Sequence, residues 1–441
     1  MDPTASACHV AAIPYPGRGH INPMFNFCYL LASMRDDVLI TFVLTQEWLG
    51  FIGSDPKPPN LRFFTIPNVI PSELVRAADF PGFWEAVMTK MEDPCERLLD
   101  RLKPPVTAIV ADTFLSWAVG MGNRRNIQVA SLWPMSVSEF YHLDNLIVQA
   151  QNSPTDMSEH SDLKENKQIF GRVKEAFSWI RKAQFLLLTS IYELEAQVID
   201  ALKAKFSFPI YSLGPLIPYF KLGHSSIPIP IPSYQSNNSG CLEWLDSQRL
   251  ASVLYISLGS FLSVSSAQMD EIAVGLQQSG VRFLWVVRGE AARIKDICGE
   301  MGMVVAWCDQ LRVLSHDSVG GFWSHCGWNS VVEGVFSGLP FLTFPLVMDQ
   351  HCNGKLIVED WKIGWRVRRE LGKEVLVKRD EIACLVKKFM DLESNEGNEM
   401  RRRARELQEI CQQAITKGES SYTNLEAFAR DIHNAATVEA G

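Results

Sequence analysis

The sequence lacks the features that mark membrane, secreted and nucleic-acid-binding proteins. Its 441 residues contain no run of about 18 uncharged apolar residues, so we expect no membrane-spanning helix. The first residues are not basic and their apolar run ends at Pro14, which argues against a secretory signal peptide. Asp and Glu outnumber Lys and Arg by 50 to 42, and this net charge of −8 argues against binding to nucleic acids or anionic membranes.

The ten cysteines are scattered and form neither a C-x-x-C pair nor a zinc-type spacing. Such cysteines are typical of reduced thiols in a protein core. We therefore expect a cytoplasmic protein with no metal site.

What the chain does contain is the pattern of an α/β protein. Its composition, 47% hydrophobic and 21% charged, is typical of globular domains, and its length suits two large ones or three smaller ones. Short apolar runs alternate with helical patterns, which predicts parallel sheets covered on both faces and hence two doubly wound, Rossmann-like domains. The predicted strands are residues 9–14, 38–44, 61–66, 106–112, 127–132 and 184–189, then 253–258, 282–287, 302–306, 319–323, 340–344 and 363–367. The clearest helical patterns in the first half are residues 25–34, 83–102 and 168–183.

Residues 215–240 form the predicted linker between the two domains. This stretch carries five prolines and a Ser/Asn cluster, a composition that suits neither a helix nor a central strand. It divides the chain into an N-terminal domain of residues 1–238 and a C-terminal domain of residues 239–417. The tail after Gly418 has apolar residues spaced three and four apart, so we expect residues 418–441 to form a helix that packs on another part of the protein.

The densest concentration of functional residue types lies between Trp307 and Gln350. A predicted strand, a short polar turn and a helix beginning at Asn329 follow one another there, and a helix N-terminus after a strand suits a phosphate group. His325 lies in the turn, and Glu333 follows Asn329 by one helical turn, where a carboxylate can accept hydrogen bonds from a ribose. The alternative is that Asn329 and its neighbour Ser330 only cap the helix and that His325 is an ordinary loop histidine.

His20 is the second candidate. It follows the first predicted strand in a Gly-rich, flexible loop, and its unperturbed pKa of about 6.5 suits a general base near neutral pH. Asp112 ends the fourth predicted strand, at the same edge of the sheet. It can orient the histidine, and it can also cap the helix that follows.

The chain resembles a known family in three places. The 44 residues from Trp307 to Gln350 resemble the donor-binding signature of plant secondary-product glycosyltransferases, the UDP-sugar-dependent family 1 enzymes. The segment PYPGRGHINP resembles the family's Gly-His-x-x-Pro loop, and YISLGS at residues 255–260 also fits. The resemblance implies a GT-B fold, with two Rossmann-like domains facing a cleft and a last helix that returns to the N-terminal domain.

The resemblance also implies a role for each matching residue. Trp307 is expected to stack on uracil and the backbone of Cys308 to read the edge of the base, while Gln310 and Glu333 hold the ribose. An acid at Asp112 is expected to pair with the general base His20. The other donor-binding positions are Ser260, His325, Asn329 and Ser330 at the diphosphate, Trp328, Asp349 and Gln350 at the sugar, and Gly327 in the turn. No metal motif is present, so departure of UDP is expected to be metal-independent.

Three positions depart from the family's pattern. Asp309 stands where proline is usual, and Phe344 replaces a frequent tryptophan. Pro134 replaces a hydroxyl residue that often contacts the sugar, and Ser136 is the expected substitute.

The resemblance therefore implies an inverting enzyme that moves glucose from UDP-glucose to a hydroxyl of a small hydrophobic acceptor and gives a β-glucoside. A flavonoid, a terpenoid and a phytohormone fit equally well as acceptors, and residues 68–82 and 140–168 are the expected acceptor loops. The alternatives are a nucleotide-sugar epimerase or hydrolase of the same fold and a non-catalytic nucleotide-sugar-binding protein. A nicotinamide-dependent dehydrogenase fits less well, because the first strand is followed by GRGHIN and not by G-x-G-x-x-G.

Overall fold

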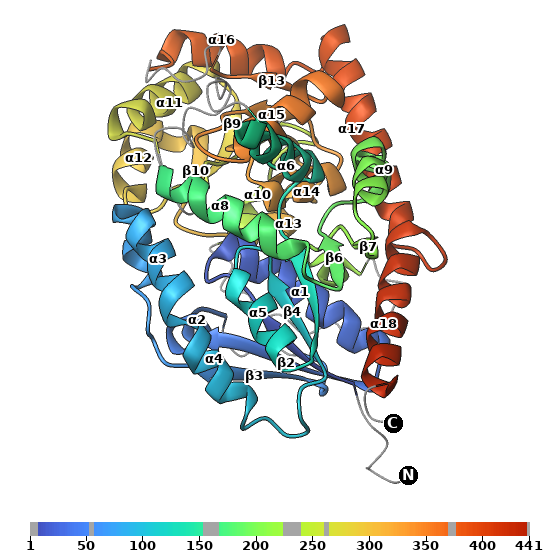
Figure 1. The fold of residues 1–441 in the computed structure, drawn as a ribbon. Helices are drawn as coiled ribbons and strands as arrows, with labels where there is room; N and C mark the ends of the chain where they lie inside the picture. The colour runs from blue at the N-terminus through green and yellow to red at the C-terminus, as the bar shows by residue number, and fades with distance from the viewer. Residues whose placement is uncertain are drawn as a thin grey trace. The chain divides into compact units, whose positions relative to one another are not determined.

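The computed structural model describes residues 8–52, 57–152, 167–223, 240–259, 264–368 and 376–438. Contacts divide the chain into two units, the first made of residues 1–232 and 413–441 and the second of residues 233–412. Each unit is built on one parallel sheet with helices around it (Figure 1), so the predicted pair of doubly wound domains is confirmed. Within the described ranges, no helix combines the length and apolarity needed to cross a bilayer.

The first unit has a seven-stranded sheet in the order β3-β2-β1-β4-β5-β6-β7, with all neighbours parallel. Its strands are β1 (Cys8–Ile13), β2 (Val38–Thr45), β3 (Leu61–Ile66), β4 (Ala108–Asp112), β5 (Gln128–Trp133), β6 (Phe185–Leu188) and β7 (Ile210–Ser212). Its helices include α1 (Arg18–Met34), α2 (Gln46–Ile52), α3 (Phe80–Lys90), α4 (Glu92–Leu99), α5 (Ser116–Arg124), α6 (Val137–Asn152), α8 (Lys167–Ile180), α9 (Ala196–Lys205) and α18 (Ser420–Val438), with 3₁₀ turns η1 (Glu73–Ala78), η2 (Tyr192–Leu194) and η3 (Tyr219–Leu222). The single helix predicted over residues 83–102 was wrong, because the chain breaks at Met91 into α3 and α4.

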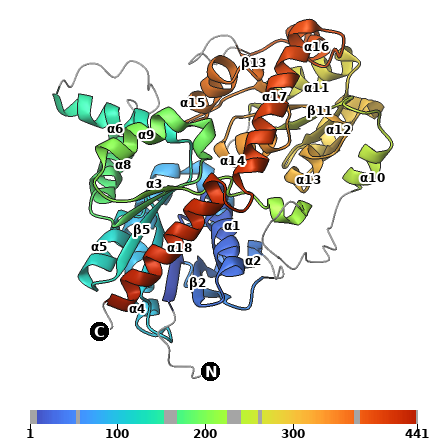
Figure 2. The same ribbon diagram turned by 90° about the vertical axis from the view of Figure 1, so that its right-hand side faces the viewer.

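The last helix, α18, belongs to the first unit and lies beside α1 (Figure 2). The ring of Phe428 packs against Phe27 of α1, Phe185 of β6 and Tyr211 of β7, with ring centroids 5.7–5.8 Å apart. The spacing of the apolar residues in this helix matches the face that is buried, which consists of Leu425, Phe428, Ala429 and Ile432.

The second unit has a six-stranded parallel sheet in the order β10-β9-β8-β11-β12-β13. Its strands are β8 (Val253–Ser257), β9 (Arg282–Val286), β10 (Gly302–Val305), β11 (Val319–Ser324), β12 (Phe341–Thr343) and β13 (Gly364–Arg366). Its helices include α10 (Cys241–Asp246), α11 (Ser266–Ser279), α12 (Ala291–Cys298), α13 (Gln310–Leu314), α14 (Trp328–Phe336), α15 (Gln350–Lys355), the π-helical turn η5 (Leu356–Asp360), α16 (Arg379–Phe389) and α17 (Asn395–Ala414).

Each sheet has one point where the strand order reverses, between β1 and β4 in the first unit and between β8 and β11 in the second. In doubly wound sheets, ligands bind beyond the carboxyl ends of the strands at this point. Ile13 is in register with Ala111, one residue before the end of β4, and Ser257 is in register with Ser324. The two strands of each pair therefore end within one residue of each other. Residues that follow β1, β4, β8 and β11 are therefore the candidates for a functional site.

Candidate functional site

His20 and Asp112 form a hydrogen-bonded pair at the switch point of the first unit. Nδ1 of His20 lies 2.8 Å from Oδ2 of Asp112, and the side chains are 23% and 0% exposed. The other carboxylate oxygen, Oδ1, accepts the backbone N–H of Phe114 at 3.0 Å. With Nδ1–H donating to the carboxylate, Nε2 of His20 carries the lone pair and can accept a proton. The carboxylate thus both orients the histidine and caps the turn after β4.

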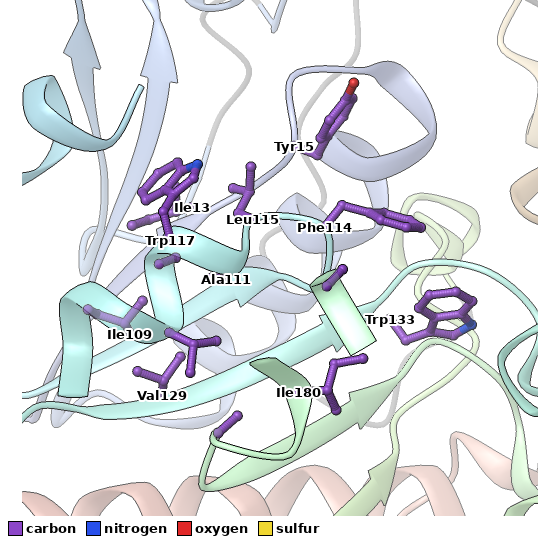
Figure 3. Packing of buried hydrophobic residues seen from close by; sticks show 14 of the residues in the cluster. Ile13, Tyr15, Ile109, Ala111, Phe114, Leu115, Trp117, Val129, Trp133 and Ile180 are labelled. Carbon is purple, nitrogen blue, oxygen red and sulfur yellow. The ribbon is translucent and has the colours of Figure 1, made fainter. Parts of the chain in front are cut away.

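The expectation that His20 lies in a flexible loop was wrong. His20 belongs to the first turn of α1, and its N–H donates to the carbonyl of Gly17 at 2.9 Å. The imidazole also packs among aromatic rings, with centroids 4.9 Å from Tyr15 and 6.0 Å from Phe114. Figure 3 shows Tyr15 and Phe114 in the hydrophobic core of this unit, where Trp133 also lies. The candidate base is therefore held by a helix and by the core.

Arg76 contacts the segment between β1 and α1, just before His20. Sequence reasoning did not identify this arginine. Its guanidinium is buried, forms an ion pair with Glu73 at 3.2 Å and donates to the carbonyl of Pro16 at 3.4 Å. A Cβ on Gly17 would lie 2.2 Å from Nη1 of Arg76, so the glycine is needed for this close approach. An arginine in a segment of mixed polarity such as SELVRAAD gives no sequence signal for such a contact.

In the second unit, the loop after β8 and the turn after β11 surround His325 closely. A Cβ on Gly259 would lie 2.8 Å from the imidazole, and a Cβ on Gly327 would lie 2.5 Å from its Nε2. Gly259 has a φ of +95°, and Cys326 between the histidine and Gly327 has a φ of +66°. Burial lowers the pKa of His325 to about 4, so the ring is neutral near pH 7. It can act as a hydrogen-bond donor without adding charge.

The helix α14 begins directly after this turn, with Gly327 as its N-cap. Its first-turn backbone N–H groups lack intrahelical partners and mark the positive end of the helix dipole. Asn329 and Ser330 lie in this turn, as expected for a phosphate site. Ser260, the remaining residue assigned to the diphosphate, lies outside the described residues.

Gln310, the first residue of α13, contacts Glu333 on α14. Nε2 of Gln310 donates to Oε2 of Glu333 at 2.6 Å and to Oγ of Ser330 at 2.9 Å. Loss of water raises the pKa of Glu333 to about 7; the hydrogen bond from Gln310 lowers it, and the charge of Asp309 raises it further. The two residues assigned to the ribose are thus brought into contact, together with one assigned to the diphosphate.

The residues assigned to the base and the sugar lie at the two ends of the signature. The indole of Trp307, between β10 and α13, is 46% exposed, and an exposed indole suits stacking on a flat base. At the other end, Asp349 accepts from Nδ2 of Asn353 at 2.8 Å, and Asn353 also donates to the carbonyl of Cys326 at 3.0 Å. Asn353, which sequence reasoning missed, thereby links Asp349, assigned to the sugar, to Cys326 in the turn assigned to the diphosphate.

Gln350 is fixed by the backbone. Its Oε1 accepts the N–H groups of Leu346 at 2.8 Å and Val347 at 3.2 Å. The amide nitrogen of Gln350 therefore points away from these two residues. Trp328, in contrast, has an indole only 4% exposed, with its centroid 6.5 Å from that of Trp361. The indole of Trp328 therefore offers little surface to a sugar.

One departure from the family's pattern, Asp309, has a structural explanation, and the structure also places Ser136. Asp309 replaces proline at the start of α13, and its carboxylate caps this helix by accepting the N–H of Arg312 at 3.4 Å. Ser136, the expected substitute for a sugar-contacting hydroxyl, is fully buried, and its Oγ accepts the N–H of Glu139 at the start of α6. The expectation that Ser136 contacts the sugar was therefore wrong.

The described residues contain no cluster of three or more His, Cys, Asp or Glu side chains suited to a metal ion. The groups gathered at the two switch points are instead a histidine–carboxylate pair and a set of neutral hydrogen-bond donors beside one acid. Such a set suits general-base chemistry and the binding of a nucleoside diphosphate.

Comparison with known proteins agrees with this geometry. Residues 237–401 match the family described as UDP-glucoronosyl and UDP-glucosyl transferase. The chain is 49% identical to UDP-glycosyltransferase 87A1 of Arabidopsis thaliana over 445 residues, which cover 95% of this chain and 99% of the relative. The chain belongs to the plant family 1 UDP-glycosyltransferases.

Solved structures of this family share the fold. The structure of Medicago truncatula UGT71G1 complexed with UDP-glucose matches with a TM-score of 0.80 and 26% identity, covering 98% of this chain and 100% of that one. The structure of Os79 from O. sativa in complex with UDP matches with a TM-score of 0.85 and 24% identity, covering 96% of this chain and 100% of that one. The two Rossmann-like domains are therefore those of a GT-B glycosyltransferase.

Proposed function

We propose that this UDP-glycosyltransferase moves glucose from UDP-glucose to a hydroxyl of a small hydrophobic acceptor, with inversion to a β-glucoside. The observation that carries the proposal is the His20–Asp112 pair, because it supplies a histidine with one ring nitrogen bound to a buried carboxylate and the other able to take a proton. A flavonoid, a terpenoid or a phytohormone would suit the acceptor side. Of the two expected acceptor loops, residues 153–166 of the second lie outside the described residues.

In the proposed mechanism, Nε2 of His20 removes the proton of the acceptor hydroxyl as its oxygen attacks the anomeric carbon. Asp112 stabilises the imidazolium that forms and keeps Nδ1 protonated throughout. The bond from the anomeric carbon to UDP breaks on the opposite face of the sugar, which converts an α-linked donor to a β-glucoside.

The negative charge that develops on UDP is proposed to be stabilised by the first turn of α14. Neutral His325, Asn329, Ser330 and backbone N–H groups are proposed to supply hydrogen bonds there, at the positive end of the helix dipole. We accordingly propose that the reaction proceeds without a metal ion. Treatment with a chelator should leave the rate of transfer unchanged.

The reaction can be tested directly by incubating the protein with UDP-glucose and a panel of aglycones and detecting glucosides by mass spectrometry. Release of free UDP is measured with and without acceptor in the same experiment. A glucosyltransferase gives glucoside and UDP in equal amounts and only in the presence of acceptor. UDP release without acceptor would indicate a hydrolase, and conversion of UDP-glucose to another UDP-sugar would indicate an epimerase.

Glucose as the donor sugar is proposed on two grounds. In this family a terminal glutamine of the signature goes with glucose, and a related structure holds UDP-glucose. A cytoplasmic location is proposed because the ten cysteines are scattered along the sequence, with neither a C-x-x-C pair nor a zinc-type spacing, as expected in a reducing compartment.

Replacement of Gln350 by alanine should lower the preference for UDP-glucose over UDP-galactose. Loss of a matched hydrogen bond costs about 1–3 kcal/mol, so the ratio of kcat/KM for the two donors should fall about tenfold or more, with little change in UDP affinity. The ratio is measured by competition between equal concentrations of both donors. Gln350→Glu is the matched variant, because it keeps the acceptor for the N–H groups of Leu346 and Val347 but loses the amide donor. If the ratio is unaltered in both variants, the sugar is selected elsewhere.

Binding of UDP-glucose should weaken as the pH falls through about 7. The pKa of Glu333 is raised to about 7, and ribose hydroxyls donate to its ionised form, so binding favours loss of the proton. Below this pKa the dissociation constant should rise by up to roughly tenfold per pH unit. Calorimetry with UDP-glucose between pH 6 and pH 8.5 measures the effect, since its diphosphate does not titrate in this range.

Two variants identify the titrating group. Glu333→Gln should give a profile that is flat with pH. Asp309→Asn, which keeps the cap of α13, removes a negative charge that raises the pKa of Glu333 and should move the midpoint to lower pH. A wild-type profile that persists in Glu333→Gln would assign the pH dependence to another group.

A further inference from the structure

Tyr255 lies on β8, and its side chain contacts Cys308, assigned to the base, and Gln310, assigned to the ribose. Its side chain is 1% exposed, and its ring packs against Phe322 of β11 with a centroid distance of 5.2 Å. By burial alone it is a core aromatic residue, and a phenylalanine would fill the same space. Its hydroxyl, however, reaches the functional site.

The hydroxyl of Tyr255 donates to Oε1 of Gln310 at 3.0 Å and lies 3.5 Å from Sγ of Cys308. Burial raises the pKa of Tyr255 well above its usual value and that of Cys308 to about 12, so both groups keep their protons near pH 7. The phenol is therefore a permanent donor.

This donor decides which way the amide of Gln310 points. Its oxygen faces Tyr255, so its nitrogen faces Ser330 at 2.9 Å and Glu333 at 2.6 Å. An ionised carboxylate only accepts hydrogen bonds, and a flipped amide would place oxygen against oxygen there. The phenol and the carboxylate thus favour the same orientation from opposite ends of the side chain.

The oriented amide also acts on Ser330. A hydroxyl that accepts a hydrogen bond from Gln310 still has its own proton to donate, and Ser330 is in the first turn of α14. One buried phenol is therefore linked through Gln310 to the acid assigned to the ribose and to the hydroxyl assigned to the diphosphate.

We infer that Tyr255 is a positioning residue for donor recognition, which acts through the amide of Gln310 to align Glu333 for the ribose hydroxyls. This inference rests on the proposed use of UDP-glucose as donor. It predicts that loss of the Tyr255 hydroxyl costs more affinity for a nucleotide that carries ribose hydroxyls than for one that lacks them.

The test compares UDP with 2′,3′-dideoxyuridine diphosphate, which lacks both hydroxyls, by calorimetry. Tyr255→Phe should weaken UDP by about 3- to 10-fold, the usual contribution of one hydrogen bond, and should weaken the dideoxy nucleotide by a clearly smaller factor. Equal losses for both nucleotides would show a merely structural role, and no loss for either would also overturn the inference. Wild-type protein that fails to bind UDP would instead refute the proposed function.

A double-mutant cycle tests the route through Gln310. In a Gln310→Ala background, Tyr255→Phe should change UDP affinity less than twofold, because the amide that it orients is absent. A full additional loss would mean that Tyr255 acts by another path. Tyr211→Phe is the matched control, since it removes a phenol hydroxyl that bonds Asp431 in the first unit and should affect neither nucleotide.

Discussion

Replacement of His20 by alanine should lower glucosyl transfer by roughly 10²–10⁴-fold, the usual contribution of a positioned general base. Affinity for UDP should remain near that of the wild type, because the donor residues lie on other elements. The rate is measured with an alcohol or a weakly acidic phenol as acceptor. With a strongly acidic phenol, which ionises without help, the loss should be much smaller.

The variant His20→Gln separates catalysis from folding. Asp112 is fully buried, and a glutamine can still donate a hydrogen bond to it, whereas alanine leaves it with only the N–H of Phe114. Glutamine cannot accept the proton, so both variants should be slow if His20 is the base. Near wild-type turnover in His20→Gln would mean that the histidine only supports the fold. His316→Ala, on a histidine that bonds Ser318 and Asp246, is the control and should retain activity.

Replacement of Trp307 by alanine should weaken UDP and UDP-glucose by the same factor, because stacking on uracil is common to both. Base–aromatic stacking is worth about 1–3 kcal/mol, which corresponds to roughly 5- to 150-fold in dissociation constant. Calorimetry with each ligand measures the two losses. Leu392→Ala, which truncates a side chain with the same 46% exposure, is the matched control. Unchanged UDP affinity in folded Trp307→Ala would show that the indole does not stack on the base.

The strands and their order of appearance could be predicted because buried parallel strands are apolar throughout. The strand β7 was missed because it has only three residues, Ile210–Ser212, and follows Pro209, so its run is too short to stand out. The helical state of His20 was missed for a different reason. Gly17, Gly19 and Pro23 signal a loop, yet α1 runs through Pro23 because Ile21, Met24 and Phe27 are all buried.

The candidate site was predictable where a local pattern carries it and not where contacts come from distant parts of the chain. The turn from His325 to Glu333 lies within one strand–helix unit, so its spacing predicts a phosphate site. Tyr255 looks like any strand aromatic in the sequence, and Asn353 looks like any helix polar residue. Only the fold brings Tyr255 to Gln310 and Asn353 to the carbonyl of Cys326.

The position of α18 has a consequence for the synthesis of the protein. Sγ of Cys8 at the start of β1 donates to the carbonyl of Ile432, and Asn424 donates to the carbonyl of Ser212 at the end of β7. The first unit therefore combines residues 1–232 with residues 413–441. Domains usually fold in the order in which they leave the ribosome. Here residues 233–412 emerge before the helix that covers Phe27, Phe185 and Tyr211. The first unit, whose synthesis begins first, is therefore completed last. Until α18 has been made, the apolar surface that it covers stays exposed, and chaperones can bind it.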